Sequence, residues 1–252
     1  MYFTDQNLDR IMRWGTDGIL TQFMLPSGRA NGMYMDADGC LVACSDAHNE
    51  LWKIAPDGSH TVLLAGDAYN ERFFNGPNDV WVHPDGSIYF TDPLYSRPWW
   101  TDERKGKEMD GKHVYRFDPK SKKLERLTTD LKQPNGIVGT SDGKQLYVSD
   151  IDAGVVLQYQ IAEDGSLTDK KVFCKDQSDG MTMDCKGNVY LSNGAGVVIY
   201  DKTGKKIENI KVPEGWTANV CFGGKNHDIL FITASKGFYC IKMQVKGENP
   251  GK

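Results

Sequence analysis

The sequence predicts an all-β protein folded as a six-bladed β-propeller. Three observations lead to this prediction: strand-like segments recur along the whole chain, tight-turn motifs separate them, and almost no stretch has the period of a helix. The 252 residues divide into six units of about 42 residues each, a length typical of a four-stranded propeller blade. We therefore expect a single domain over residues 1–252, with no internal linker.

Each unit is expected to contain the same succession of strands. A first apolar run leads into a turn rich in Asp and Gly, and a second strand of β-branched and aromatic residues follows the turn. A third strand comes after most of these, as at 50–56 and 155–162. The charged stretch 101–112 is expected to be a solvated loop. The second strands are expected at residues 1–5, 40–45, 87–92, 145–150, 188–193 and 229–234.

The first and last blades are expected to be incomplete. The chain opens on sequence that aligns with the second strand of a blade, so the first strand of that blade has no counterpart. The last unit ends after 237–243, where an outer strand would follow. We interpret the chain as short at its N-terminus, and we expect unpaired strand edges to weaken the closure of the propeller.

One polar residue stands at the same place in five of the six units, at the entrance to the first strand. In four units it lies 8 positions before the turn glycine, and in the last unit alignment of the second strands places it. The first strand of each blade lines the central channel of a propeller, so these side chains are expected to gather at one mouth of the channel. They are Asn31, Asn78, Asn135, Asp179 and Asn219.

Amide and carboxylate oxygens are the ligands that a hard cation prefers. We therefore expect one divalent cation bound by Asn78, Asn135 and Asp179, with Asn31 and Asn219 as second-line positions. Calcium fits this donor set best, and magnesium, manganese or zinc are alternatives. Asn or Asp before Gly can also serve only to stabilise a turn, and that alternative stays open for each position.

A cation held in this way could polarise the carbonyl group of a bound lactone, and Asp179 beside it could accept the proton of the attacking water. Asp179 is therefore the predicted catalytic residue. Loop residues around the mouth are candidates for binding the substrate, and the alternative is that their aromatic rings only pack the loops onto the rim. We expect the stretch 96–112 to form a lid over the mouth. The candidate substrate-binding residues are Asn78, Tyr95, Arg97, Trp99 and Trp216.

Composition narrows the classes of partner. Lys+Arg 30 against Asp+Glu 34 gives a formal net charge of -4, which does not favour a nucleic-acid partner, and no apolar run is long enough to predict a membrane span. The six cysteines show no zinc-ligand spacing and are expected to be reduced thiols, mostly buried in strands. A cytoplasmic location is favoured, with a secreted or periplasmic one as the alternative if a further N-terminal segment exists. The oligomeric state is left open.

Three stretches carry a resemblance to a known family: "NDVWVHPDGSIYFTDPLY", "QPNGIVGTSDGKQLYVSD" and "SDGMTMDCKGNVY". They resemble the senescence marker protein/gluconolactonase family, relatives of diisopropyl fluorophosphatase and the drug-responsive lactonases, and the resemblance extends over essentially the whole chain. It implies a six-bladed propeller that binds a divalent cation, usually calcium, and hydrolyses sugar lactones. Asn135 and Asp179 match metal-binding residues of the family, and Asn78 matches an Asn that contacts metal or substrate.

This chain departs from the family pattern at two places. Gly76 stands where the animal members carry an Arg, and the Glu ligand of the first blade has no counterpart. The expected function is a metal-dependent hydrolase that opens a sugar lactone at the channel mouth, with a small-molecule lactone as its partner. One alternative is an organophosphate or ester hydrolase that uses the same site. The other is a non-catalytic propeller that binds a partner, which the missing Glu would favour.

Overall fold

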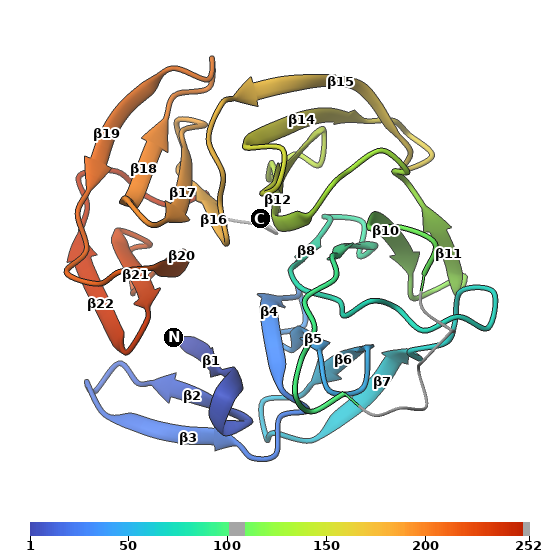
Figure 1. The fold of residues 1–252 in the computed structure, drawn as a ribbon. Helices are drawn as coiled ribbons and strands as arrows, with labels where there is room; N and C mark the ends of the chain where they lie inside the picture. The colour runs from blue at the N-terminus through green and yellow to red at the C-terminus, as the bar shows by residue number, and fades with distance from the viewer. Residues whose placement is uncertain (101–108, 249–252) are drawn as a thin grey trace. The chain divides into compact units, whose positions relative to one another are not determined.

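The computed structural model describes residues 1–100 and 109–248. Apart from a short 3-10 helix at Gln6–Leu8, the regular elements of these residues are strands. They form six antiparallel sheets, each made of strands that are consecutive in the chain, as the colour order in Figure 1 shows. This confirms the prediction of an all-β six-bladed β-propeller. The chain divides into two compact units, Met1–Pro134 and Asn135–Lys252, which are described in turn.

The first unit contains three sheets. The first sheet consists of β1 (Tyr2–Asp5), β2 (Arg10–Trp14) and β3 (Leu20–Met24). The second consists of β4 (Ala30–Met35), β5 (Leu41–Ser45), β6 (Glu50–Ile54) and β7 (His60–Leu64). The third consists of β8 (Val80–Val82), β9 (Ile88–Asp92), β10 (His113–Asp118) and β11 (Lys123–Arg126). The strands that open successive sheets in chain order lie together, since β4 contacts both β1 and β8.

The second unit also contains three sheets. One consists of β12 (Pro134–Gly139), β13 (Gln145–Asp150), β14 (Val155–Ile161) and β15 (Leu167–Cys174). The next consists of β16 (Met181–Met183), β17 (Val189–Asn193), β18 (Gly196–Tyr200) and β19 (Lys206–Ile210). The last consists of β20 (Thr217–Gly223), β21 (Ile229–Ala234) and β22 (Gly237–Lys242). Here too the first strands are neighbours, because β20 contacts β16.

The strands lie where the sequence repeats place them. The six predicted second strands correspond to β1, β5, β9, β13, β17 and β21. The first and last sheets have three strands each and the other four sheets have four, as expected for these two blades. The structure therefore confirms the phasing of the repeats from which the strand-entrance residues were chosen.

Turn glycines set the register between first and second strands. The Gly86 N–H donates to the carbonyl of His83 at 2.8 Å, and the His83 N–H donates to the carbonyl of Ser87 at 2.8 Å. Gly86 has φ 93°, a backbone conformation that only glycine adopts without strain. Gly39 and Gly187 repeat this arrangement, each with a positive φ. Gly143 also has a positive φ and donates to the carbonyl of Thr140, but the Thr140 N–H donates to the carbonyl of Gln145, two residues after the glycine. These turns explain why the Asp-Gly signals in the sequence predicted the strand boundaries well.

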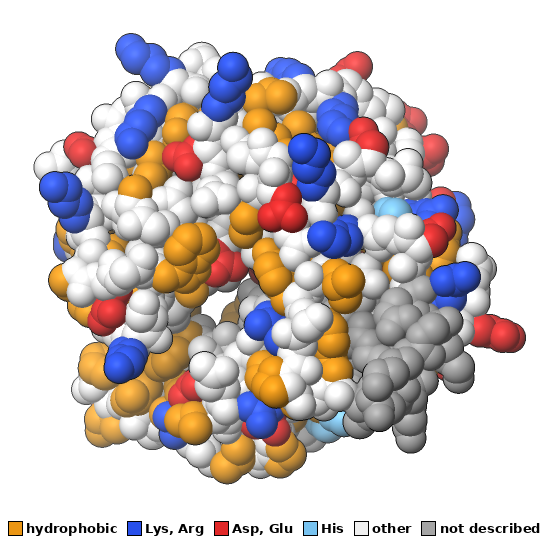
Figure 2. Space-filling model, viewed as in Figure 1, with side chains coloured by type: hydrophobic (Ala, Val, Ile, Leu, Met, Phe, Trp, Pro, Cys, Tyr) orange, Lys and Arg blue, Asp and Glu red, His pale blue; other side chains and the backbone are white. Residues whose placement is uncertain are grey.

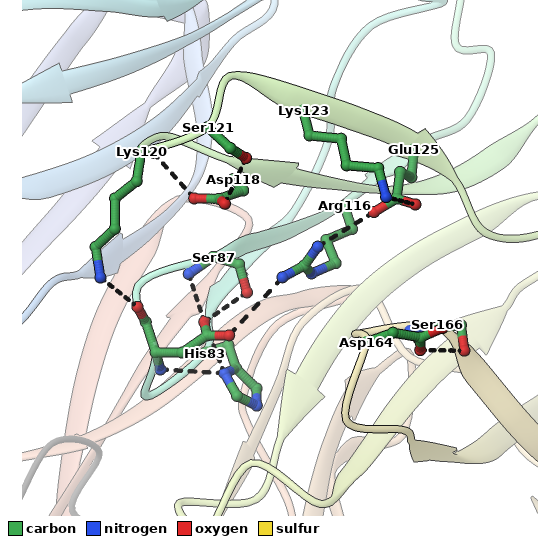
Figure 3. Close-up of polar contacts among 11 residues, drawn as sticks. His83, Ser87, Arg116, Asp118, Lys120, Ser121, Lys123, Glu125, Asp164 and Ser166 are labelled. Atoms are coloured by element: carbon green, nitrogen blue, oxygen red, sulfur yellow. Dashed lines mark hydrogen bonds and ion pairs between the residues drawn. The ribbon is translucent and has the colours of Figure 1, made fainter.

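The turn between β8 and β9 is joined to the outer strands of its sheet by charged side chains (Figure 3). The Asp85 carboxylate lies 2.8 Å from Nδ1 of His83 and 3.8 Å from the guanidinium of Arg116. Arg116 also pairs with Glu125 at 3.2 Å. These contacts give His83 a structural role, at the end of β8 that is remote from Asn78.

Apolar cores within each unit hold neighbouring sheets together. In the first unit Phe74 packs edge-on against Phe90 and Tyr115, and all three are fully buried beside residues of the β4–β7 sheet. In the second unit Tyr190 and Phe222 meet edge-on between the last two sheets. Each side chain of this size stabilises the fold by roughly 1.5–3 kcal/mol when fully buried. The strand entrances are thus attached to a rigid scaffold.

The surface and the cysteines add two findings. Basic and acidic side chains are interspersed over the face shown in Figure 2, and no helix of the described residues is long and apolar enough to cross a membrane. All six cysteines are free, as expected. The expectation that most are buried is wrong for Cys185, Cys221 and Cys240, which are exposed. Alternate residues of a strand face opposite sides, and Cys221 lies between the buried Val220 and Phe222.

Candidate active site

Two of the predicted ligands occupy equivalent positions in their sheets. The Asp179 N–H donates to the carbonyl of Ser192 at 2.9 Å, and the Ser192 N–H returns a bond of 3.1 Å to the carbonyl of Gly180. The same pair of hydrogen bonds occurs at Asn78 in the first unit, where the Asn78 N–H donates to the carbonyl of Thr91 at 2.8 Å. In both sheets the entrance to the first strand is therefore fixed against the end of the second strand.

Hydroxyl groups lock the Asp179 entrance further. Ser192 Oγ accepts a bond from the Gly180 N–H at 2.9 Å and lies 2.9 Å from the carbonyl of Ala218 in the next sheet. Ser178 Oγ donates to the carbonyl of Gly180 at 2.6 Å, while the Ser178 N–H donates to Ser149 Oγ at 2.8 Å. Because three neighbouring sheets share these bonds, the backbone on both sides of Asp179 has little freedom to move.

Glycines let successive strand entrances approach closely. A Cβ at Gly136 would lie 2.7 Å from the carbonyl oxygen of Asp179, and one at Gly180 would clash with the side chain of Asn219. These contacts place Asn135, Asp179 and Asn219 on adjacent strand entrances of the second unit. The glycines that follow Asn135 and Asp179 in the sequence thus make room for the next entrance.

The first unit shows the same arrangement at Asn31 and Asn78. A Cβ at Gly32 would lie 2.7 Å from the carbonyl oxygen of Asn78, and the Gly32 N–H donates to that oxygen at 2.7 Å. Asn78 is followed by Asp79 rather than by glycine, and the Asp79 carboxylate accepts the Val80 N–H at 3.0 Å. Asn31 and Asn78 are therefore adjacent within this unit. That the residues of both units surround one cation stays a prediction.

The side chains at the entrances differ in exposure. Asn78 and Asn135 are buried, with exposed fractions of 6% and 3%, whereas Asp179 is half-buried. Oδ2 of Asp179 accepts a hydrogen bond of 2.7 Å from the indole Nε1–H of Trp216. Asn219 Oδ1 accepts the Val220 N–H at 2.8 Å, so part of its hydrogen-bonding capacity serves its own strand. The carboxylate is thus the most accessible of the three predicted ligands.

The oxygen donors at these entrances suit a hard cation better than zinc. Among the described residues, no group of three or more His, Cys, Asp or Glu side chains is placed to hold a metal ion. A site in the second unit would therefore combine the Asp179 carboxylate with neutral amide oxygens, which is the chemistry that calcium accepts. The adjacent entrances of Asn135 and Asp179, each followed by a glycine that permits close approach, fit such a cation.

Three of the predicted substrate-binding residues of the first unit, Tyr95, Arg97 and Trp99, lie together beside Asp46. The Asp46 carboxylate accepts bonds from the indole of Trp99 at 3.2 Å and from Gln6 at 3.2 Å, and it pairs with Nε of Arg97 at 3.2 Å. The Arg97 guanidinium also lies 5.5 Å from the centre of the Tyr95 ring. Tyr95, Arg97 and Trp99 are thus brought together, as expected from their positions in one loop. Part of the predicted lid over 96–112, residues 101–108, lies outside the described residues.

Asp46 also explains why glycine occupies position 76. A Cβ there would lie 2.8 Å from Oδ1 of Asp46 and 3.0 Å from the Trp100 ring, and Gly76 has φ 134°. The Trp100 indole donates to the Asp46 carbonyl at 3.0 Å. An Arg side chain at position 76 would not fit this arrangement.

Sequence reasoning missed both Asp46 and the serine pair Ser178 and Ser192. A signal was present, because a Ser or Thr followed by Asp or Asn ends the second strands at 45–46, 91–92, 149–150 and 192–193. Ser192 and Thr91 show what the hydroxyl does, since each accepts a backbone N–H at the strand entrance. The position after it supplies side chains that support the rim, as Asp46 and Asp92 do.

The fold and the polar strand entrances together define a β-propeller with a candidate cation site formed by oxygen ligands. The chain belongs to the family described as SMP-30/Gluconolactonase/LRE-like region, whose profile matches residues 1–236. The resemblance inferred from the sequence motifs is thereby confirmed.

Named relatives agree with this membership. The chain is 29% identical to the gluconolactonase of Zymomonas mobilis subsp. mobilis over 274 residues, covering 98% of this chain and 76% of that protein. A solved gluconolactonase structure from Xanthomonas campestris superposes with a TM-score of 0.87 at 28% identity, covering 96% of this chain and 81% of the other. A calcium-binding regucalcin structure from Agrobacterium tumefaciens has a TM-score of 0.78 at 18% identity, covering 100% and 88%, a likeness that shows the fold alone. The two gluconolactonases support the prediction that the chain is a lactone-hydrolysing enzyme.

Proposed function

We propose that this chain is a metal-dependent hydrolase that opens a sugar lactone of the gluconolactone type. The observation that carries the proposal is that the Asn135 and Asp179 strand entrances are adjacent, since a Cβ at Gly136 would lie 2.7 Å from the Asp179 carbonyl oxygen, in a chain of the gluconolactonase family. Calcium is the favoured cation because the donors are oxygens and include one carboxylate. A divalent cation bound there supplies a Lewis acid that polarises the lactone carbonyl and makes a nearby water more acidic.

Each residue of the site has a distinct part in this proposal. Asn135 and Asp179 are ligands from adjacent strand entrances, and the sequence prediction adds Asn78. Asp179 also accepts the proton of the water that attacks the carbonyl carbon, because a carboxylate within hydrogen-bond reach of that water can act as a general base. Neutral amide ligands leave most of the cation's charge available to the developing oxyanion.

The rim residues are the candidates for recognising the sugar. Trp99 and Tyr95 present aromatic rings near the Arg97 guanidinium, and all three side chains are partly exposed. Aromatic rings stack on the apolar faces of sugars, while cations and amides bind hydroxyl groups. We include Trp99, Tyr95 and Arg97 in the substrate site on this basis. No observation favours the organophosphate hydrolase or the non-catalytic module over the lactonase.

The decisive experiment measures hydrolysis of glucono-1,5-lactone by the acid that it releases. Protein treated with a chelator is compared with the same protein resupplied with Ca²⁺, Mg²⁺ or Mn²⁺, and diisopropyl fluorophosphate is tested in parallel. We expect lactone hydrolysis that depends on the added cation and is lost in Asp179→Asn. Hydrolysis that survives chelation would reject the metal-dependent mechanism, and preference for the fluorophosphate would transfer the proposal to the organophosphate class.

A further inference from the structure

A tryptophan of the second unit is bonded directly to the predicted catalytic carboxylate. Trp216 lies in the segment just before β20, and its indole Nε1–H donates to Asp179 Oδ2 at 2.7 Å across 37 positions of sequence. This distance is at the short end for an N–H···O bond, as expected when the acceptor is charged. The sequence predicted Trp216 only as part of a substrate-binding wall.

The surroundings of Trp216 indicate that the indole is oriented rather than merely packed. Its ring is 36% exposed, so burial does not fix it in a core. The ring lies beside Gly194, where an added Cβ would be 3.8 Å from it, and the Trp216 carbonyl accepts a hydrogen bond from Ser235 Oγ at 3.3 Å. The next residue, Thr217, is buried at the start of β20. The backbone is therefore anchored, and the bond to Asp179 sets the direction of the exposed ring.

The same bond fixes the carboxylate. A hydrogen bond to Oδ2 restricts rotation of the Asp179 side chain, and the backbone on both sides is already held by Ser178 and Ser192. Ligating carboxylates of metal sites are characteristically hydrogen-bonded by such outer partners, whose loss typically weakens metal binding or activity by about 10- to 100-fold. The indole is a neutral donor, so it orients the carboxylate without cancelling its charge.

We propose that Trp216 is a positioning residue that holds Asp179 in its cation-binding orientation through the indole N–H. The inference rests on the cation site of the proposed function, and its test is chosen to be independent of lactone turnover. Trp216→Phe is the informative variant because it keeps an aromatic ring and removes only the donor and part of the ring. The chain offers a matched control at Trp52, whose indole donates to Glu50 at 2.6 Å within β6, in the other unit.

The first measurement is calcium affinity by titration calorimetry, made on the wild type, Trp216→Phe and Trp52→Phe. We expect about 10- to 100-fold weaker binding in Trp216→Phe, by the effect of an outer hydrogen-bond partner, and unchanged binding in Trp52→Phe. Melting temperatures are recorded for all three, and an unchanged melting temperature in Trp216→Phe shows that the fold is intact. Equal calcium affinity in the wild type and Trp216→Phe would overturn the proposal.

The second measurement observes the indole N–H directly by ¹⁵N-labelled tryptophan NMR. The Trp216 signal is assigned from its absence in Trp216→Phe, and CaCl₂ alone is then titrated into the wild type. We expect this signal to shift as calcium saturates the site, and to lose that response in Asp179→Asn, while the Trp52 signal stays fixed. No response of the Trp216 signal to Ca²⁺, Mg²⁺ or Mn²⁺ would reject the proposal even if the chain hydrolyses lactones.

Kinetics separate positioning from substrate stacking. A positioning role lowers kcat in Trp216→Phe and leaves KM for glucono-1,5-lactone nearly unchanged, because the phenyl ring still presents an aromatic face. A rise in KM with kcat and calcium affinity unchanged would instead assign Trp216 to the substrate wall and overturn the inference. If the wild type binds calcium with the expected indole response but opens no lactone, the positioning role stands and the proposed activity falls.

Discussion

Two tryptophan–aspartate pairs of this protein share the same indole-to-carboxylate hydrogen bond in different surroundings. In the first unit Trp99 donates to Asp46 at 3.2 Å, and in the second unit Trp216 donates to Asp179 at 2.7 Å. Asp46 is 3% exposed and also receives a guanidinium from Arg97. Asp179 is half-buried and stands at a strand entrance beside a predicted cation site.

From the hydrogen-bond donors around each carboxylate, we predict a structural role for Asp46 and a functional role for Asp179. A buried carboxylate must be paired and hydrogen-bonded, and the donors around Asp46 come from segments far apart in sequence, so its charge joins those segments together. The indole bond at Asp179 orients the group and leaves its negative charge in place. We therefore expect substitution of Asp46 to affect mainly stability, and substitution of Asp179 to affect mainly cation binding and catalysis.

The largest effect is expected for Asp179→Asn. Loss of the carboxylate removes the predicted general base and one ligand charge, so kcat/KM for glucono-1,5-lactone should fall by about 10²- to 10⁴-fold. The side chain is half-buried and nearly isosteric, and the free energy of unfolding should change by less than about 0.5 kcal/mol. Lactone-hydrolysis rates and urea denaturation of the same preparation check both parts. Activity near the wild-type level would remove Asp179 from the mechanism.

Asp46→Asn should reverse this pattern. The amide cannot pair with Arg97, and its NH₂ group competes with the indole and amide donors that meet the carboxylate, so unfolding should become easier by about 2–3 kcal/mol. Urea denaturation measures this loss, and Asp38→Asn is the control. Asp38 pairs with Lys53 at 2.9 Å, yet its side chain is 76% exposed, and loss of such an exposed pair should leave the free energy of unfolding nearly unchanged. Equal losses in the two variants would show that Asp46 is not a structural anchor.

The contrast between these pairs also shows what the sequence could and could not predict. Strands and turns depend on local patterns, namely alternating apolar residues and turn glycines, and the structure confirms their predicted positions. The same patterns predicted the phase of Asn135 and Asp179. The hydrogen-bond donors to Asp46 could not be predicted in this way. Gln6 and Trp99 lie 40 and 53 positions away from Asp46 in the sequence, and no local sequence pattern predicts such a contact.

The same limit applies to Trp216 and to the cysteines. The position of Trp216 before a strand predicted that it lies near the strand entrances, but only the folded chain reveals that its N–H reaches Asp179. Apolar neighbours in the sequence suggested that Cys221 is buried, whereas the twofold alternation of the strand places it on the exposed side. Sequence patterns thus predicted where these residues lie along the chain's strands, whereas their contacts and exposure depend on the folded chain.

Gly136→Ala tests whether the Asp179 entrance depends on close backbone approach. The new methyl group would lie 2.7 Å from the Asp179 carbonyl oxygen, and since that contact is with backbone, the entrance must shift. We expect a loss of about 1–3 kcal/mol in stability, with weaker calcium binding measured by calorimetry. Gly215→Ala is the control, because a Cβ there meets nothing within 4 Å. Normal calcium affinity in Gly136→Ala would mean that the site tolerates movement of this backbone.

The smallest effect is expected for Trp99→Phe, the counterpart of the Trp216→Phe variant. The bond from Trp99 to Asp46 is long at 3.2 Å, and Gln6 and Arg97 remain to pair with the carboxylate, so its loss should cost only about 0.5–1.5 kcal/mol of stability. The cation–π contact of Arg29, whose guanidinium lies 4.6 Å from the centre of the Trp99 ring, survives in weakened form because phenylalanine keeps an aromatic face. Calcium affinity should stay at the wild-type value, since Asp46 is not a predicted ligand. Calorimetry and urea denaturation of the two Trp→Phe variants, side by side, provide the check. If Trp99→Phe weakened calcium binding as much as Trp216→Phe, the two pairs would have to be regarded as parts of one functional site. A structural role for Asp46 could then no longer be distinguished from the positioning role proposed for Trp216.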